Sequence, residues 1–394
     1  MNLLADRGFI PSSQKHGGNN KNHLHVENCS EHYDMAQWSI SRFKGIPQPT
    51  KYLVKDFIPA GIAGTIYSAG GTGKSTLCLD LAIRISISDQ VPCLWLGKFP
   101  VVNCGSVIYL SAEEPENVLH KRLFELESVI AKQTGYDQEK VHNLASRNLW
   151  LINLWGNTKL LFKTTANNLE PTEEYQKLYN TIESMQDIRL VILDTRSRLS
   201  GAEGSGNALV SQEVVYYERL ASTFGCNVLI LHHSNKISYS NNGHPAAAVR
   251  GESAFLDAFR FGMYISSFTD DEARKQNIPL DEKPNYLIIQ NSKQNYTEIK
   301  HPVVLKRYNY EFELTTLNPR LGPEEEKVKQ RENDIILVCD LIAESGSMNQ
   351  TEIIKKLFNK MSKNRVRDAL EAGILLGKIK KTKGEHGALY YEII

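Results

Sequence analysis

Short apolar runs alternate with amphipathic stretches from about residue 46 to residue 316. This alternation of strands and helices is typical of an α/β domain with a mostly parallel sheet. Because the runs are apolar at nearly every position, both faces of the sheet are expected to be covered. The expected strands are Gly64–Tyr67, Ser106–Leu110, Leu190–Leu193, Asn227–Leu231 and Tyr286–Gln290, the expected helices lie near 74–87, 115–132, 171–185, 211–224 and 250–259, and a terminal hairpin is expected from Val303–Leu305 and Tyr310–Thr315.

The two ends of the chain differ from this central domain. Residues 1–45 are polar and lack a hydrophobic period, which predicts a flexible N-terminal tail. Residues 317–331 contain two prolines, a glycine and three successive glutamates, which predicts a linker. Residues 332–394 then show three helical stretches followed by two strand-like segments, the pattern of a small winged-helix domain.

Composition narrows the class of protein only a little. The 394 residues include 46 basic and 45 acidic side chains, a net charge of +1, so a globally basic nucleic-acid-coating protein is excluded. A local basic patch remains compatible with that balance. No apolar run approaches 18 residues, so no membrane span is expected. Six scattered cysteines without a Cys-x-x-Cys pair favour a reducing, cytoplasmic setting.

The strongest chemical signal is a glycine-rich turn between an apolar strand and an amphipathic helix. The segment Ser68–Thr76 reads Ser-Ala-Gly-Gly-Thr-Gly-Lys-Ser-Thr. Such a turn wraps backbone N–H groups around a phosphate chain at a helix N-terminus. Lys74 would reach the β and γ phosphates of ATP, and the Ser75 hydroxyl would ligate Mg²⁺. The strict pattern has Gly where this chain has Ser68. The predicted nucleotide-binding residues are Gly70, Gly71, Thr72, Gly73, Lys74, Ser75 and Thr76.

Acidic residues end two of the other expected strands. Asp194 follows four apolar residues and is predicted to hold Mg²⁺ together with Ser75. Glu113 and Glu114 follow the strand that contains Tyr109. A carboxylate at that point can polarise the water that attacks the γ-phosphate. We assign that role to Glu113, and we assign Glu114 to the start of the following helix, where acidic residues are favoured.

A pair of histidines, His232 and His233, ends a fourth strand. Adjacent strand residues face opposite ways, so at most one of them points at a phosphate if the strand continues to that point. The alternative is a histidine satisfied within the sheet. Arg250 and Arg260 follow the long polar stretch 235–249, and either could stabilise the transferred phosphate from a neighbouring subunit. Each could equally be a surface charge.

The C-terminal segment 351–394 is basic, with ten Lys or Arg and five acidic residues. Lys363, Arg365 and Arg367 begin the third helix, where a helix-turn-helix protein meets DNA, and Lys378–Lys383 leads into the expected wing. This distribution favours contact with DNA phosphates. A solvated helix face on a protein-binding domain is the alternative.

Taken in order, these motifs resemble those of the plasmid RepA-type hexameric replicative helicases, within the wider RecA/DnaB-like ATPases. The resemblance covers about residues 46–300 and rests on Ala69–Ser75, Tyr109–Pro115, Leu193–Arg198, Leu231–Lys236, Arg250–Ala254 and Ser292–Asn295. It implies a RecA-like P-loop core that uses ATP and Mg²⁺. It implies that Lys74 and Glu113 are catalytic, that His232 and His233 sense the γ-phosphate, and that Arg250 or Arg260 is a trans-acting finger.

The resemblance also implies a homo-hexamer that encircles single-stranded DNA. The sequence therefore predicts an ATP-dependent DNA helicase or translocase that acts in replication of a plasmid, phage or mobile element. One alternative is an ATP-switched initiator, loader or regulator that binds duplex DNA through the winged helix. A second alternative is a RecA-like recombination ATPase.

Overall fold

The computed structural model describes residues 33, 35–165, 168–202, 205–233, 253–296, 302–317, 323–383 and 389–393. The chain divides into two units, Met1–Pro49 and Thr50–Ile394. In the first unit, a short 3-10 helix η1 (Ile40–Arg42) is capped by Ser39. The Arg42 guanidinium stacks over the rings of Trp38 and Phe43.

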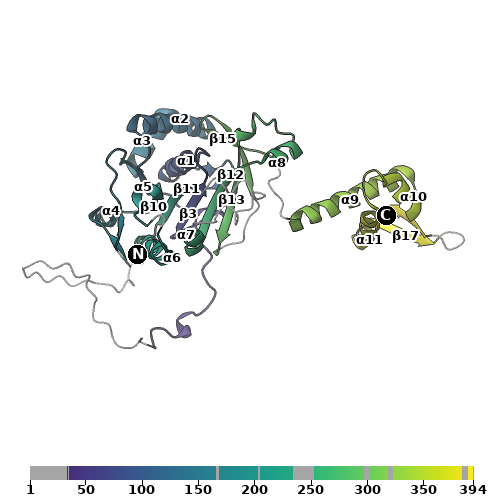
Figure 1. Ribbon diagram of the computed structural model, residues 1–394, viewed down its shortest axis with the longest axis horizontal. Coiled ribbons are helices and arrows are strands. Elements are labelled where there is room, and N and C mark those ends of the chain that lie inside the picture. Colours follow the sequence, from purple (N-terminus) through teal and green to yellow (C-terminus); the bar gives the residue numbers. More distant parts are fainter. Residues whose placement is uncertain are drawn as a thin grey trace, which may run out of the picture. The chain divides into compact units, whose positions relative to one another are not determined.

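A nine-stranded sheet is the centre of the second unit (Figure 1). Its strand order is β15-β14-β13-β12-β3-β11-β10-β6-β7. The six strands from β12 to β7 are parallel, and β13, β14 and β15 extend the sheet as antiparallel strands. The predicted α/β fold with a mostly parallel sheet is therefore confirmed. The strands are β3 (Ala63–Ser68), β6 (Ser106–Ser111), β7 (Leu149–Asn153), β10 (Ile188–Asp194), β11 (Asn227–His233), β12 (Phe261–Ser267), β13 (Tyr286–Gln294), β14 (Val303–Tyr308) and β15 (Glu311–Leu314).

Helices cover both faces of this sheet, as the apolar strands require. Along β10, Leu190 and Ile192 enter one core with α1, α2 and α3, whereas Val191 and Leu193 enter the other with α4, α6 and α7. The two-residue alternation of a strand thus divides one apolar run between two cores. The helices are α1 (Lys74–Ile87), α2 (Glu116–Thr134), α3 (Gln138–Asn148), α4 (Glu173–Ser184), α5 (Arg196–Leu199), α6 (Asn207–Phe224), α7 (Ser253–Ala258) and α8 (Asp270–Lys275).

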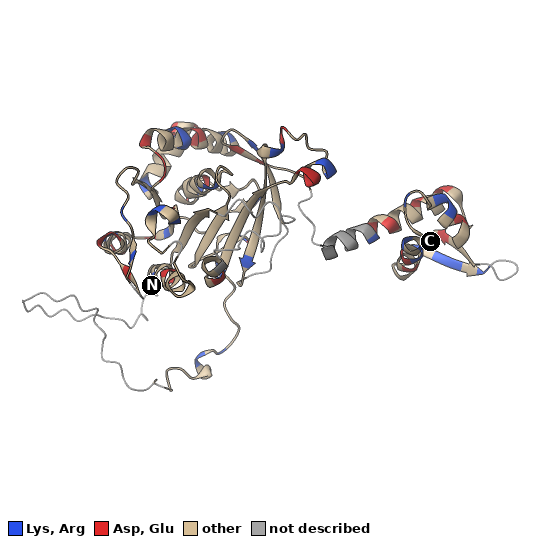
Figure 2. Ribbon diagram, in the orientation of Figure 1, with Lys and Arg blue, Asp and Glu red and all other residues tan. Residues whose placement is uncertain are grey.

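Smaller elements connect these layers. Within the described residues, three two-stranded ribbons are β1 (Tyr52–Val54) with β2 (Ile58–Pro59), β4 (Leu94–Trp95) with β5 (Phe99–Pro100), and β8 (Phe162–Thr164) with β9 (Leu169–Pro171). A 3-10 helix, η4 (Lys283–Asn285), precedes β13. In Figure 2 the strands of the large sheet are mostly uncharged, and charged residues gather on helices and loops such as those at α2. Among the described helices, none has the length and apolar character that crossing a bilayer would need.

Two strands of the large sheet were not predicted from the sequence. β7 forms one edge of the sheet, beside β6, and β12 lies between β3 and β13. The helix expected near 250–259 spans only Ser253–Ala258, and the chain enters β12 three residues later. The sequence prediction thus omitted the strand that joins the parallel part of the sheet to its antiparallel part.

The C-terminal elements have a hydrophobic core of their own. They are α9 (Pro323–Ser345), β16 (Met348–Asn349), α10 (Gln350–Leu357), α11 (Lys363–Leu375), β17 (Ile379–Lys383) and β18 (Leu389–Ile393). Asn349 and Glu352 form the predicted capping box of α10. The helix expected over 334–344 begins earlier, at Pro323, within the stretch that was predicted to be a linker. The division into four domains, and the winged-helix assignment, remain predictions.

Candidate nucleotide-binding site

The predicted P-loop connects β3 to α1. All six residues of β3 are buried, which fixes the start of the loop, and α1 begins at Lys74. Gly71 and Gly73 have φ values of 78° and 95°, in the left-handed region that favours glycine. These two glycines let the loop turn tightly before the helix. The arrangement matches a loop whose backbone amides face a phosphate chain.

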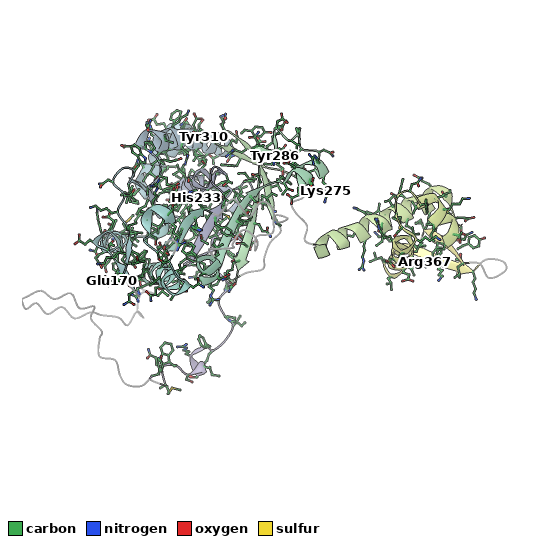
Figure 3. The ribbon with its side chains drawn as sticks, viewed as in Figure 1. Glu170, His233, Lys275, Tyr286, Tyr310 and Arg367 are labelled. Atoms are coloured by element: carbon green, nitrogen blue, oxygen red, sulfur yellow. The ribbon has the colours of Figure 1, made fainter. Side chains whose placement is uncertain are left out.

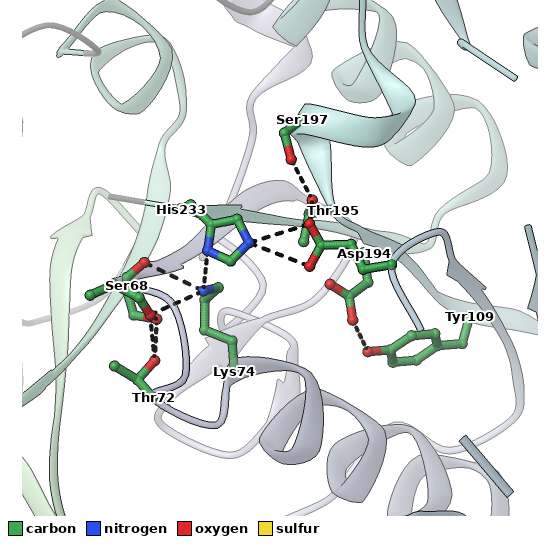
Figure 4. A network of polar contacts seen from close by, with 10 residues as sticks. Ser68, Thr72, Lys74, Tyr109, Asp194, Thr195, Ser197 and His233 are labelled. Atoms are coloured by element: carbon green, nitrogen blue, oxygen red, sulfur yellow. Dashed lines mark hydrogen bonds and ion pairs between the residues drawn. The ribbon is translucent and has the colours of Figure 1, made fainter. Parts of the chain in front are cut away.

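Ser68 occupies the position where the strict P-loop pattern has glycine. Its φ is not positive, so the backbone at this point does not require glycine. Its hydroxyl donates to the Ala69 carbonyl at 2.9 Å and is hydrogen-bonded to the Thr72 hydroxyl (Figure 4). The Thr72 hydroxyl also donates to the Ala69 carbonyl, at 3.0 Å. Serine therefore fits this loop and stiffens it from within.

Lys74 lies in a cluster with His233 and Glu113 (Figure 4). The Lys74 Nζ is 3.2 Å from Nδ1 of His233, and Nε2 of the same ring is 3.4 Å from the Glu113 carboxylate. Lys74 also lies 3.4 Å from the Ser68 carbonyl oxygen. In Figure 3, His233 is seen among the side chains of the domain that contains the large sheet. One imidazole thus connects the predicted phosphate-binding lysine to the predicted water-activating carboxylate.

Thr195, immediately after β10, fixes the other side of Glu113. Its hydroxyl donates to Oε1 of Glu113 at 3.0 Å and lies 2.8 Å from the Ser197 hydroxyl. Glu113 therefore receives hydrogen bonds from two neighbouring strands of the sheet. This support holds the carboxylate in one orientation, which a general base needs.

Asp194 and Ser75 lie where a magnesium ion would be held. Asp194 accepts a 2.6 Å hydrogen bond from the Tyr109 hydroxyl through Oδ2. Its Oδ1 is buried, and no hydrogen-bond partner for that atom occurs among the described residues. A buried carboxylate oxygen without a partner beside a serine hydroxyl is the donor chemistry that Mg²⁺ accepts. The residues therefore fit the predicted metal, whose chemistry would be to neutralise charge on the phosphates.

Burial and hydrogen bonding shift the pKa values of these groups in opposite directions. Burial lowers the pKa of Lys74, and Asp194 and Glu113 oppose that shift. Burial raises the pKa of Asp194, whereas the hydrogen bond from His233 lowers the pKa of Glu113 below its ordinary value. Glu113 is therefore the carboxylate of this cluster that is kept ionised, the state in which it can accept a proton.

The Glu113–His233 contact predicts a specific pH dependence. Glu113 must be ionised to act as a base, so its activity is lost as the pH falls through its lowered pKa. In His233→Ala the hydrogen bond is absent and burial alone acts, so the pKa of Glu113 rises. We expect the acid limb of the single-turnover rate of ATP hydrolysis to move to higher pH. His233→Gln retains a donor near the same point and should restore most of the wild-type limb. Equal limbs in all three proteins would contradict this role.

His232 and Arg260 lie outside the cluster. His232 is 1% exposed, and its ring packs edge-on against Phe255 at a centroid distance of 5.4 Å. The strand continues through both histidines, so the two rings face opposite sides of the sheet. Arg260 is exposed and precedes β12, level with the amino end of β3 and away from the P-loop. Arg250 lies outside the described residues.

A buried ion pair lies directly beyond the strand end that carries Asp194. Arg196, in α5, donates to Glu213 of α6 with an Nη2–Oε2 distance of 2.9 Å, and the two side chains are 2% and 0% exposed. The Tyr217 hydroxyl donates to Glu213 at 2.9 Å, and the Arg196 guanidinium stacks 3.8 Å from the centre of the Phe255 ring. These contacts fix α5, whose cap is Thr195, against α6 and α7.

Several supporting residues were not assigned a role from the sequence. Tyr109 and Thr195 were quoted within motifs, but each was one polar residue in or after a strand. Nothing in the sequence identified the partner of Arg196. Glu114 pairs with Arg122 of α2 at 2.6 Å, in agreement with its assignment to the helix. Within the described ranges, no group of three or more His, Cys, Asp or Glu side chains is arranged to hold a metal by itself.

Comparison with known proteins identifies the family. Two similar solved structures are the ATPase domain of a helicase, with 13% identity, a TM-score of 0.48 and coverage of 72% of this chain and 99% of that one, and "Crystal structure of the RadB recombinase", with 13% identity, a TM-score of 0.39 and coverage of 64% and 90%. Both scores are below 0.5, so the assignment rests on a family model instead. The model described as AAA domain matches residues 29–238, more than half of the chain, including the P-loop, Glu113, Asp194 and both histidines. The chain therefore belongs to the AAA domain family.

Proposed function

We propose that this protein is an ATPase of the RecA/DnaB type that couples hydrolysis to movement on single-stranded DNA, as a helicase or translocase in replication of a plasmid, phage or mobile element. The observation that carries the proposal is the cluster of Lys74, His233, Glu113 and Thr195. It places a phosphate-binding cation beside a supported, ionised carboxylate. The motif order that resembles RepA-type helicases supports the more specific part.

In the proposed reaction, the P-loop amides and Lys74 bind the phosphates of ATP. Glu113 accepts a proton from the attacking water, and Thr195 and His233 keep its carboxylate oriented. His233 contacts both Lys74 and Glu113, so a γ-phosphate that displaces Lys74 from the ring would also alter the support of the base. We propose that this ring reports the nucleotide state to the segment that follows β11.

The position of Arg260 supports an assembly of several copies. In the parallel pairing of β12 with β3, Gly262 lies opposite Thr65 and Ile265 lies opposite Ser68. Arg260 is thus separated from the P-loop by about the length of β3, roughly 20 Å at the rise of a strand. An arginine at that end of the sheet can act only on the nucleotide of a neighbouring subunit. We propose it as the trans-acting finger of a homo-hexamer, together with or in place of Arg250.

A second candidate is an ATP-switched initiator, loader or regulator that binds duplex DNA through the C-terminal domain. The exposed lysines of β17, Lys380, Lys381 and Lys383, favour it (Figure 2). Arg365 pairs with Asp334 of α9 and is therefore occupied within the domain. Lys363 and Arg367 are exposed on α11. DNA contact by this domain would thus depend more on the β17 hairpin than on the start of α11.

The proposal is tested by ATP hydrolysis with and without single-stranded DNA, for the wild type and Lys74→Ala. We expect stimulation by single-stranded DNA in the wild type, and loss of hydrolysis in Lys74→Ala because the phosphate-binding cation is absent. Strand-separation assays would then test the helicase directly. Hydrolysis that is indifferent to single-stranded DNA would refute the motor and favour the DNA-binding regulator. The β17 lysines would then be the next residues to test.

A further inference from the structure

Arg307, near the end of β14, lies against the P-loop of its own chain. Its Nη1 atom is 3.3 Å from the point where a β-carbon on Gly73 would lie. The Phe312 ring, opposite Arg307 in the β14–β15 pairing, lies 3.8 Å from the same point. The antiparallel extension of the sheet therefore returns to the phosphate-binding loop. It brings a guanidinium to the residue that immediately precedes Lys74.

The guanidinium of Arg307 has no counter-charge within the described part of the chain. The side chain is half-buried, and it makes no hydrogen bond or ion pair with a described residue. Its neighbour Lys306 differs: it pairs with Glu282 at 2.9 Å and stacks on Tyr286 and Tyr308. Adjacent strand residues face opposite sides, which explains why only Lys306 reaches these partners. A partly desolvated cation that lacks an anion is costly, and an incoming anion reduces that cost.

The strand order shows which part of a nucleotide Arg307 would meet. Glu113 and His233 reach the P-loop from β6 and β11, on one side of β3. Arg307 reaches it from β14, on the other side of β3. If the γ-phosphate lies beside Glu113 and His233, the phosphate chain runs from there across the loop toward β14. Arg307 is then beside the phosphates nearer the nucleoside.

We propose that Arg307 binds the α- or β-phosphate of the nucleotide in the same subunit. This inference rests on the proposed ATPase function and adds a residue that the sequence motifs did not supply. Because ATP and ADP share these phosphates, Arg307 would bind both nucleotides and would not distinguish them. It would hold the product as well as the substrate, whereas Glu113 and His233 respond to the γ-phosphate. The main alternative is that the guanidinium only packs on Phe312 and contributes nothing to binding.

The test measures equilibrium binding of ATP, ADP and inorganic tripolyphosphate to the full chain. The variants are Arg307→Gln, which removes the charge and keeps most of the stem, and Arg307→Lys, which keeps the charge. Arg274→Gln is the matched control, because Arg274 is an exposed cation paired only with Asp271 within its own helix. Thermal unfolding of each variant without nucleotide checks that the domain is intact.

We expect Arg307→Gln to weaken ATP, ADP and tripolyphosphate alike, by about 10- to 100-fold, the usual value of a hydrogen bond to a charged group. Arg307→Lys should recover part of the loss, kcat at saturating ATP should change little, and Arg274→Gln should match the wild type. Weaker binding of ATP and ADP with unchanged tripolyphosphate would overturn the phosphate assignment and indicate the nucleoside. Unchanged binding of all three would overturn the proposal, whereas a wild type that binds no ATP would refute the proposed function itself.

Discussion

Replacing Glu113 by Gln is expected to lower kcat for ATP hydrolysis by about 10²- to 10⁴-fold, the usual contribution of a general base. Glutamine has nearly the same shape and can still accept the hydrogen bond from Thr195, but it cannot take a proton from water. Lys74 and the P-loop glycines are untouched, so ATP binding should persist. The expected protein binds ATP and retains it without turnover.

Single-turnover hydrolysis and equilibrium ATP binding measure these two effects separately. Glu114→Gln is the matched control, because Glu114 is the adjacent acid and pairs with Arg122 on the helix side. It should hydrolyse ATP at close to the wild-type rate. If Glu114→Gln were the slow variant and Glu113→Gln the active one, the assignment of the base would be wrong.

Removing the charge of Glu213 is expected to cost about 3–5 kcal/mol in the free energy of unfolding, since it leaves the buried Arg196 without its partner. The variant Glu213→Gln also weakens the hydrogen bond from Tyr217. The loss should be greatest among α5, α6 and α7, which the pair holds together. Because Thr195 caps α5 and supports Glu113, kcat should fall before the protein unfolds.

Urea denaturation followed by circular dichroism gives the change in stability. In the double variant Arg196→Met/Glu213→Leu both charges are replaced by apolar side chains, and most of the loss should be recovered. Lys163→Gln, which breaks an exposed pair with Glu170, should cost less than about 1 kcal/mol. A Glu213→Gln variant as stable as Lys163→Gln would show that the buried pair does not hold these helices.

The fold was predictable where apolar runs are bounded by polar turns. β3, β10 and β11 are buried along their whole length and were identified within one or two residues. β12 was not, because the apolar run that begins at Phe261 contains Gly262 and directly follows a helix. β7 is an edge strand with partly exposed residues, so its composition resembles that of a loop. Such strands are defined by their neighbours, which a single sequence does not show.

The candidate site was predictable only where a motif carries the signal. Lys74 and Asp194 follow from spacing and strand ends, and alternation indicated that one histidine would face the phosphate. The register of β11 decides that it is His233 and not His232. Thr195 and Tyr109 needed the pairing of β10 with β6, which places Asp194 opposite Ser111. Arg307 required the return of β14 to the P-loop, which no local pattern encodes.

The contacts around Lys74 also set when, during synthesis, this site can form. Lys74 and His233 are 159 positions apart in the chain, and Glu113 and His233 are 120 apart. Contacts at such separations form late in folding because long loops must close first. A chain emerging from the ribosome therefore exposes its P-loop well before the strand with His233 has been made. ATP hydrolysis is expected to be absent in every nascent chain that ends before β11.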